Sequence, residues 1–230
     1  MLAAAAVCPQ TPLIVTGLPE LRAACRAAID ALLTARPDVL IVLGGAESTA
    51  AYGGDAAGTL RPWGFDVTAG AGEPVLPLSL TVGRCLLSRG GPDGAPAREQ
   101  APGRAPDAFH AVAFDAAAEE CRSVGEKLAE AGERVALLVL ADGPACLTPR
   151  APGRYDRAAQ PYDDLLAHAI AAADAAALAA LDPAEADRLW VTGRAALQAL
   201  AGAAGANAYE GRLLMRAAPY GVGYFAGLWT

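Results

Sequence analysis

The chain has 230 residues, a length that fits one large α/β domain and is enough to bury a sizeable core. Its formal net charge is −7, and no cluster of Lys and Arg follows a helix face. This charge pattern argues against a nucleic-acid groove, since such grooves need a basic patch.

The first 45 residues predict a strand, a helix and a second strand. The apolar run 2–8 predicts a buried strand, and the Pro-containing segment 9–17 predicts an extended loop, because proline biases the preceding residue away from helix. Apolar residues recur at helical spacing over 18–36. The segment 37–45 predicts a second buried strand, so the order describes a βαβ unit with parallel strands.

The middle of the chain is less regular. The segment 46–77 is polar and Gly-rich, so we expect a long surface excursion with one strand at 64–68. The segment 78–90 predicts a helix, and 109–114 alternates like a strand. Between them, 91–108 is rich in Pro and Gly and predicts a mobile loop.

The most apolar part of the chain follows a predicted helix at 115–132. The segment 133–142 contains RVALLVL and predicts a central buried strand. It leads into the loop ADGPACLTPRAPGRYD, residues 141–156, which is rich in Pro, Gly and Ala. Active sites of α/β folds lie in such loops, at the carboxyl ends of the strands.

The last third of the chain predicts helices and then two strands. Helices are expected over 160–181, 182–190 and 191–205, and Asp182 followed by a proline is a good helix start. The segment 209–229 predicts two strands joined by a Pro-Tyr-Gly turn. We therefore predict an α/β fold: a single domain, 1–230, with a largely parallel central sheet flanked by helices.

Cellular location is predicted from the first residues and from the cysteines. The start MLAAAAVCPQTP has no basic residue, and two prolines interrupt it, which favours a buried strand over a signal peptide. No apolar run reaches the roughly 20 residues of a membrane span. Five scattered cysteines without metal-site spacing favour a reducing, cytoplasmic compartment.

Several segments together resemble one protein family. They are AAAVCPQTPLIV (4–15), RPDVLIVLGGAE (36–47), VLADGPACLTPRAPGRYD (139–156), VTGRAALQALAGA (191–203) and APYGVGYFAGLW (218–229). In this order they resemble the B-type chain of class III extradiol ring-cleavage dioxygenases and its MEMO-type relatives. The nearest resemblance is to small, Ala-rich, actinobacterial-type members of this family. The resemblance implies the fold of the B-type chain and makes self-association into a homo-oligomer plausible.

The resemblance also implies a chemistry. The family holds an iron(II) ion through two His and one carboxylate, with open positions for a catecholate and dioxygen. A further His acts as acid and base during ring opening.

This sequence departs from the family at each of those positions. Gln10 stands where the first ligand His is expected, Ala46 where the second is expected, and Ala145 where the acid/base His is expected. Val191 and Thr192 stand where the carboxylate, or the Cys of the MEMO-type relatives, would lie. The chain has two His in all, at 110 and 168, outside these motifs. We therefore expect no metal and no cofactor.

Four residues at or near those positions could have either a functional or a structural role. Gln10 either hydrogen-bonds a ligand or satisfies nearby backbone groups. Glu47 either binds a cationic or hydroxyl-bearing ligand or is a solvated loop carboxylate. Asp142 either acts as a base, with its pKa raised by burial, or shapes the turn. Cys146 is either a thiolate nucleophile or a small buried hydrophobe.

Three functions are compatible with these residues. The first is a metal-free pseudoenzyme that binds a small molecule or acts as a scaffold. The second is a divergent enzyme acting on a small aromatic or cyclic substrate. The third is an iron dioxygenase whose ligands are relocated or supplied by a partner. Nucleic acid and membrane are not expected as partners.

Overall fold

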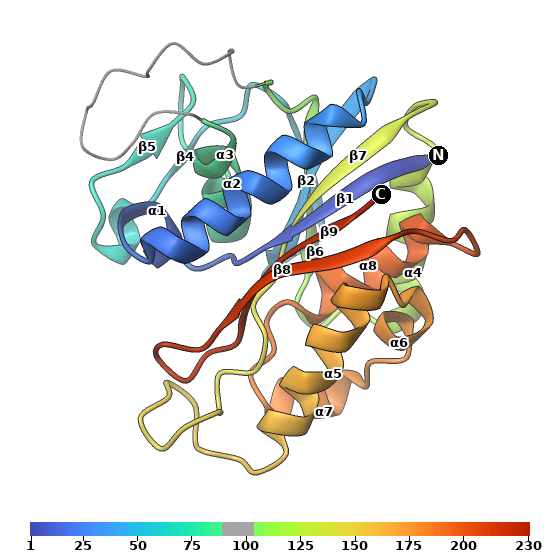
Figure 1. Cartoon of the computed structure of the whole chain (residues 1–230). Helices are drawn as coiled ribbons and strands as arrows, with labels where there is room; N and C mark the ends of the chain where they lie inside the picture. The colour runs from blue at the N-terminus through green and yellow to red at the C-terminus, as the bar shows by residue number, and fades with distance from the viewer. Residues whose placement is uncertain (89–103) are drawn as a thin grey trace.

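The computed structural model describes residues 1–88 and 104–230, and most of its strands belong to one mixed sheet (Figure 1). Their order is β3-β6-β2-β7-β1-β9-β8. The central strands β6, β2, β7 and β1 run parallel, whereas β3, β9 and β8 are antiparallel to their neighbours. These strands are β1 (Leu2–Cys8), β2 (Val39–Ala46), β3 (Ala50–Gly53), β6 (Ala108–Ala113), β7 (Val135–Leu140), β8 (Gly211–Ala217) and β9 (Tyr224–Trp229).

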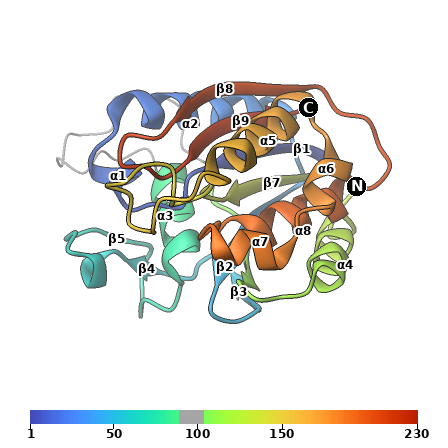
Figure 2. The same ribbon diagram turned by 90° about the horizontal axis from the view of Figure 1, so that it is seen from below.

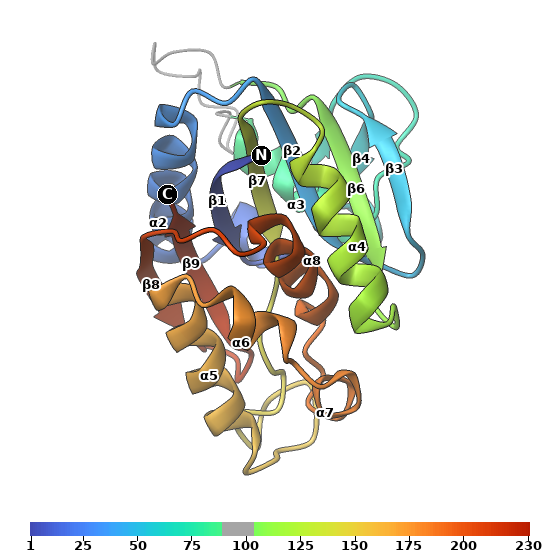
Figure 3. The same cartoon turned by 90° about the vertical axis from the view of Figure 1, so that its right-hand side faces the viewer.

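Helices cover both faces of the sheet, so the described residues form one α/β domain of three layers (Figure 3). One face carries α1 (Leu13–Thr16), α2 (Pro19–Thr34) and α3 (Leu78–Leu87). The other carries α4 (Ala118–Ala129), α5 (Ala159–Ala172), α6 (Ala175–Ala179), α7 (Pro183–Arg188) and α8 (Arg194–Ala204). The predicted α/β fold with a largely parallel sheet is therefore confirmed.

The first βαβ unit is also confirmed, with one addition. Strands β1 and β2 are parallel, but they are not neighbours, because β7 lies between them and pairs with both. The most apolar strand thus occupies the centre of the sheet. Every residue of β7 is buried, as expected for a strand covered on both faces.

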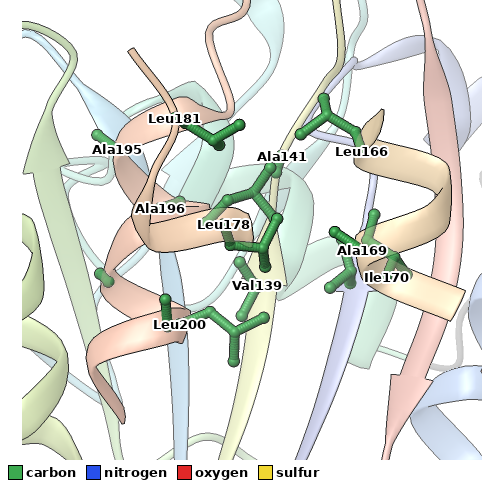
Figure 4. Close-up of a cluster of buried hydrophobic side chains, with 14 of the residues drawn as sticks. Val139, Ala141, Leu166, Ala169, Ile170, Leu178, Leu181, Ala195, Ala196 and Leu200 are labelled. Atoms are coloured by element: carbon green, nitrogen blue, oxygen red, sulfur yellow. The ribbon is translucent and has the colours of Figure 1, made fainter. Parts of the chain in front are cut away.

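The core is divided by the sheet into two clusters. Val135, Leu137 and Val139 of β7 face α4 to α8, whereas its alternate residues face α2 and α3. Figure 4 shows Val139 in the first cluster, with Leu178 beside it and Leu200 and Ile170 on either side. These apolar contacts fix α5, α6 and α8 against the sheet.

Small residues let two helices approach closely. A Cβ atom at Gly125 of α4 would overlap the carbonyl oxygen of Ala199, and one at Gly202 of α8 would overlap that of Arg122. Helix α8 is buried along its whole length, between the sheet and α4. The abundance of Ala in this part of the chain therefore has a packing role in addition to its helix propensity.

The extended loop predicted at 9–17 is partly wrong. Helix α1 begins directly after Pro12, whose φ of −64° and ψ of −19° are already helical. Proline restricts the residue before it, but its own φ suits the start of a helix. Pro12 therefore begins this short helix.

The excursion 46–77 contains more strand than predicted. Ala50–Gly53 forms β3, which pairs with β6 and extends the sheet at one edge. The predicted strand at 64–68 is largely wrong, since only the two-residue β5 (Thr68–Ala69) forms, paired with β4 (Gly58–Thr59). A short 3₁₀ helix, η1 (Arg61–Trp63), joins β4 and β5. Such short strands are set by their partners, which local sequence does not reveal.

The helix predicted at 160–181 is divided into two. Ala173 has a φ of 52°, in the left-handed region, and it ends α5. The Asp174 side chain then caps α6 by accepting a hydrogen bond from Ala177 N at 2.9 Å. The predicted N-cap Asp182 is confirmed, because its carboxylate accepts from Ala184 N at 2.9 Å.

The mobile loop predicted at 91–108 falls mostly on residues 89–103, outside the described part of the chain. Its last residues are described. Asp107 exchanges two hydrogen bonds with the backbone of Leu40, at 2.7 and 2.8 Å, and this pairing positions the start of β6 beside β2.

Candidate functional site at the carboxyl edge of the sheet

Three predicted site residues lie together at the carboxyl ends of the parallel strands. Gln10 follows β1, Ala46 ends β2, and Asp142 follows β7. Because β1 and β2 flank β7, these positions meet at one edge. Figure 2 views the molecule from below, with the loop after β7 in yellow and α7 in orange.

Gln10 connects the loop after β1 to two other segments. Its backbone N–H donates to Asp142 Oδ1 at 3.0 Å, and its side-chain Nε2 donates to Thr192 Oγ1 at 2.6 Å. Gln10 is only 6% exposed, and its Oε1 has no hydrogen-bond partner among the described residues. If the amide were turned by 180°, Nε2 would take the place of Oε1 and would lack a partner there. One buried polar atom of Gln10 therefore has no hydrogen-bond partner in either orientation.

Asp142 has the most unusual acid–base property at this edge. The residue is partly exposed, but its carboxyl is removed from water, and this desolvation raises its pKa to about 7. The N–H groups of Gln10 and Thr11 donate to the carboxyl and oppose the rise. Asp142 can therefore exchange a proton near neutral pH.

Tyr224 lies near Asp142 at the start of β9. Burial, and then the negative charge of Asp142, raise the pKa of the Tyr224 phenol to about 12, while a hydrogen bond with the Thr11 side chain opposes the rise. The phenol thus stays protonated and can donate hydrogen bonds.

The loop after β7 is held rigidly by its backbone. Ala145 N donates to Leu189 O at 3.0 Å, Leu147 N to Gly221 O at 3.1 Å, and Asp156 N to Cys146 O at 3.1 Å. These bonds tie the loop to the end of α7, to the turn before β9 and to itself. A loop rich in Pro and Gly is therefore an ordered part of the site's surroundings.

Ala145 and Cys146 point into opposite sides of the core. Ala145 belongs to the cluster on the α2 and α3 face, and Cys146 to the cluster on the α4 to α8 face. Cys146 is 2% exposed, and burial and the charge of Asp156 raise the pKa of its thiol, which Arg188 opposes. A thiolate nucleophile needs a lowered pKa and access, so the geometry favours the packing interpretation of Cys146.

The end of β2 is also closely packed. The Ser79 hydroxyl donates to Gly45 O at 2.7 Å, and Phe114 N donates to Ala46 O at 2.9 Å. A Cβ atom at Gly45 would come within 2.5 Å of the Phe114 ring and 3.0 Å of Thr192 O. Ala46 is thus buried, whereas Glu47 is exposed just beyond it.

A cavity of about 340 Å³ adjoins this cluster. Its walls come from the end of β6, from α7 and from the connection between α7 and α8. The residues that matter to its chemistry are Phe114, Asp115, Asp187, Trp190, Thr192 and Arg194. Thr192 is the member that also bonds to Gln10, so the cavity and the polar cluster share one residue.

Two aromatic side chains are exposed at the cavity. Phe114 is 36% exposed and Trp190 is 56% exposed. Trp190 also has a φ of 55°, a left-handed conformation that costs roughly 1–3 kcal/mol for a residue other than glycine. This conformation ends α7, with Trp190 N donating to Asp187 O at 3.0 Å and Val191 N to Ala186 O at 2.8 Å, and it leaves the Trp190 ring exposed at the cavity.

Arg194 closes the cavity from inside the protein. It is 4% exposed and donates to the carbonyl oxygens of Ala116 at 2.5 Å and Phe114 at 2.6 Å, and to Gln198 Oε1 at 3.0 Å. These bonds fix the backbone between β6 and α4, and so they fix Phe114.

The residues at this edge do not fit an iron(II) site of two His and one carboxylate. Ala46 and Ala145 have no side-chain atom that could bind a metal. Of the other predicted positions at this edge, Gln10 and Thr192 are neutral and Asp142 supplies one carboxylate, so no His is present among them. In the described ranges, no group of three His, Cys, Asp or Glu side chains is placed to hold a metal.

The two His lie elsewhere in the fold. His110 is within β6, beside Leu43 and Ala51 of the neighbouring strands, and burial lowers its pKa. His168 is on the exposed side of α5.

Sequence reasoning missed the aromatic and acidic members of the cavity. Phe114 and Asp115 directly follow β6, at the same edge as Ala46, and Trp190 and Asp187 lie just before Thr192. Phe114 ends the predicted strand 109–114 and Asp115 follows it, so their place at a strand end was a usable signal. Trp190 ends α7 in a left-handed conformation, which the sequence does not indicate.

Comparison with known proteins gives a fold but no family. A scan against models of known protein families finds no match, and no curated protein matches the chain. The chain is similar to the crystal structure of the uncharacterized protein JW3007 from Escherichia coli K12, with a TM-score of 0.52 and 13% identity over 98% of this chain and 99% of that chain. A likeness at this identity shows a shared α/β fold.

In the described residues, no helix is long and apolar enough to cross a membrane.

Proposed function

We propose that this protein binds a small molecule in the cavity beside Thr192, without iron. It would be a pseudoenzyme relative of the B-type extradiol dioxygenase chain, in which the ring-cleavage chemistry has been lost. The sequence resemblance supports the ancestry, and the replacement of the expected ligands by Gln10, Ala46 and Ala145 supports the loss.

The observation that carries this proposal is the cavity itself. Its volume of about 340 Å³ lies in the usual range for small-molecule sites, roughly 300–1,000 Å³. Phe114 and Trp190 offer apolar ring surface, and Thr192 adds a hydroxyl at the same carboxyl edge where α/β proteins bind ligands. The Gln10 amide holds the Thr192 hydroxyl from behind, through its Nε2 at 2.6 Å.

A combined metal and ligand experiment tests the proposal. The protein is purified anaerobically with added Fe(II), and bound iron and catechol-dependent oxygen uptake are measured. We expect no stoichiometric iron and no oxygen uptake, together with thermal stabilisation by members of a small aromatic and cyclic library. One iron per chain with ring cleavage would instead establish the iron dioxygenase alternative, in which ligands are relocated or supplied by a partner.

A second candidate function rests on Asp142. A carboxyl with a pKa of about 7 beside a protonated Tyr224 phenol is suited to proton transfer on a small substrate. In that divergent enzyme, Asp142→Asn would abolish turnover and leave ligand affinity within about two-fold. In a pure binding protein no turnover exists to lose, so a product search by mass spectrometry separates the two functions.

We propose a cytoplasmic protein whose partner is a small molecule, without nucleic acid or membrane, and which self-associates as the family resemblance implies. Sedimentation velocity of the full chain tests the self-association directly, and a single monomeric species would contradict it.

A further inference from the structure

The cavity beside Thr192 has a charge pattern as well as an apolar surface. Asp115 and Asp187 are exposed residues of its lining. Neither forms an ion pair within the described residues. Two carboxylates without cationic partners therefore face solvent at the same opening as the rings of Phe114 and Trp190.

The one positively charged residue in the lining of this cavity, Arg194, is already engaged. The Arg194 guanidinium is 4% exposed, and its hydrogen bonds go to two carbonyl oxygens, to an amide oxygen and to the Cys121 sulfur at 3.6 Å. A ligand anion would have to displace those bonds to reach it. Among the lining residues, the two carboxylates outnumber this single guanidinium, so the lining carries a net negative charge.

Aromatic faces reinforce the same preference. The face of a Trp or Phe ring attracts a cation within about 6 Å of its centre, and quaternary ammonium groups are recognised by such rings. Neither Phe114 nor Trp190 is paired with another aromatic ring within the described residues, and part of each side chain is exposed at the cavity, 36% and 56%.

We propose that the ligand of this cavity is an organic cation, an ammonium group joined to an apolar ring or cyclic body. The ammonium lies between the carboxylates of Asp115 and Asp187, and the apolar body rests against Phe114 and Trp190. This inference rests on the proposed binding function and names the chemical class of its ligand.

Three probes of similar size test the charge preference. Benzyltrimethylammonium is a permanent cation, benzyl alcohol is neutral, and phenylacetate is an anion. Binding is measured by titrating tryptophan fluorescence in Trp63→Phe, which removes an exposed Trp that lies outside the cavity. We expect the cation to bind roughly ten-fold more tightly than the alcohol, and phenylacetate to bind weakest.

A carboxylate variant supplies the matched readout. Asp115→Asn with Asp187→Asn keeps the size of both side chains and should weaken cation binding by about ten-fold, leaving benzyl alcohol unchanged. Glu130→Gln, an exposed change after α4 and outside the cavity lining, should have no effect. Raising the salt concentration should weaken cation binding by the parent and by the Glu130 variant, but should not change cation binding by the double variant.

The outcomes separate this inference from the binding function. Equal or tighter binding of benzyl alcohol or phenylacetate would overturn the cation preference while the cavity stayed a binding site. Absence of binding by all three probes would overturn both. Cation binding that the double variant retains would overturn the assignment of Asp115 and Asp187.

Discussion

The backbone N–H of Gln10 donates to the Asp142 carboxylate at 3.0 Å, although the two residues are 132 positions apart in the chain. The bond joins the loops after β1 and β7, two neighbouring parallel strands. It also orients one residue of the candidate site against another. The pair therefore organises the carboxyl edge between these two strands.

Asp142 should give the protein an unusual dependence of stability on pH. The folded-state pKa is about 7, whereas an unfolded Asp titrates near 3.9. Between these values the folded chain keeps a proton that the unfolded chain has lost, so this contribution is full below pH 4 and is lost as the pH rises through 7. In the parent, the free energy of unfolding should fall by up to about 4 kcal/mol between pH 4 and pH 8 from this group. The Asp142→Asn side chain stays neutral at every pH, so this fall should be absent in the variant.

Urea unfolding at pH 4.5, 6 and 8 measures this difference. The parent should lose stability relative to Asp142→Asn as the pH rises, while Glu130→Gln should follow the parent. Parallel pH profiles for the parent and Asp142→Asn would contradict the assigned pKa.

Gly45 should be essential for the shape of the cavity. A methyl group there would meet the Phe114 ring and Thr192 O, so Gly45→Ala should move Phe114 and cost about 1–3 kcal/mol of stability. Gly44→Ala meets Ser79 on the opposite face of the sheet and should cost a similar amount. Only Gly45→Ala should also lose ligand affinity beyond what unfolding explains, as measured by titration well below the melting temperature. Equal affinities in the two variants would exclude Phe114 as part of the binding surface.

Substitutions of Trp190 should change stability and ligand affinity separately. Trp190→Ala keeps the positive φ without the ring, whereas Trp190→Gly also relieves the backbone. We expect the Gly variant to be more stable than the Ala variant by about 1 kcal/mol, the reverse of their order in a helix. Both should lose most ligand affinity, measured by isothermal titration calorimetry because each change removes the fluorescent reporter. Retained affinity in either variant would show that the exposed ring is not a ligand contact.

Much of this fold could be predicted from the sequence, and part of the site could not. The buried run Val135–Leu140 and the capping residue Asp182 depend on local periodicity and local hydrogen bonds, which a single sequence displays. The break at Ala173 depends on a left-handed conformation that alanine rarely adopts, so helical spacing concealed it.

Part of the candidate site was likewise predictable from the sequence, and part was not. Gln10, Asp142 and Thr192 were identified and lie together, because their segments end at one edge of the sheet. Asp187 and Trp190 were missed, since their place at the cavity depends on how α7 and the connection after it lie beside the end of β6. That arrangement is tertiary and leaves no periodic signal.

Cys146 should behave as a core residue. Because it is buried and its thiol pKa is raised, it should react slowly with 5,5′-dithiobis(2-nitrobenzoate) until the protein unfolds. Cys146→Ala should cost about 1 kcal/mol and leave ligand affinity within about two-fold. Rapid modification of Cys146 in the folded protein, accompanied by loss of binding, would place its thiol at the site instead.

The central claim is a small-molecule site at the carboxyl edge that works without metal, and Trp190 reports on it directly. The decisive measurement is a fluorescence titration of Trp63→Phe with benzyltrimethylammonium, performed with a metal chelator and again with added Fe(II). We predict saturable quenching, unchanged by the chelator or by iron and absent when Trp190→Gly is added. Quenching that appears only with Fe(II), or that persists with Trp190→Gly, would contradict the claim.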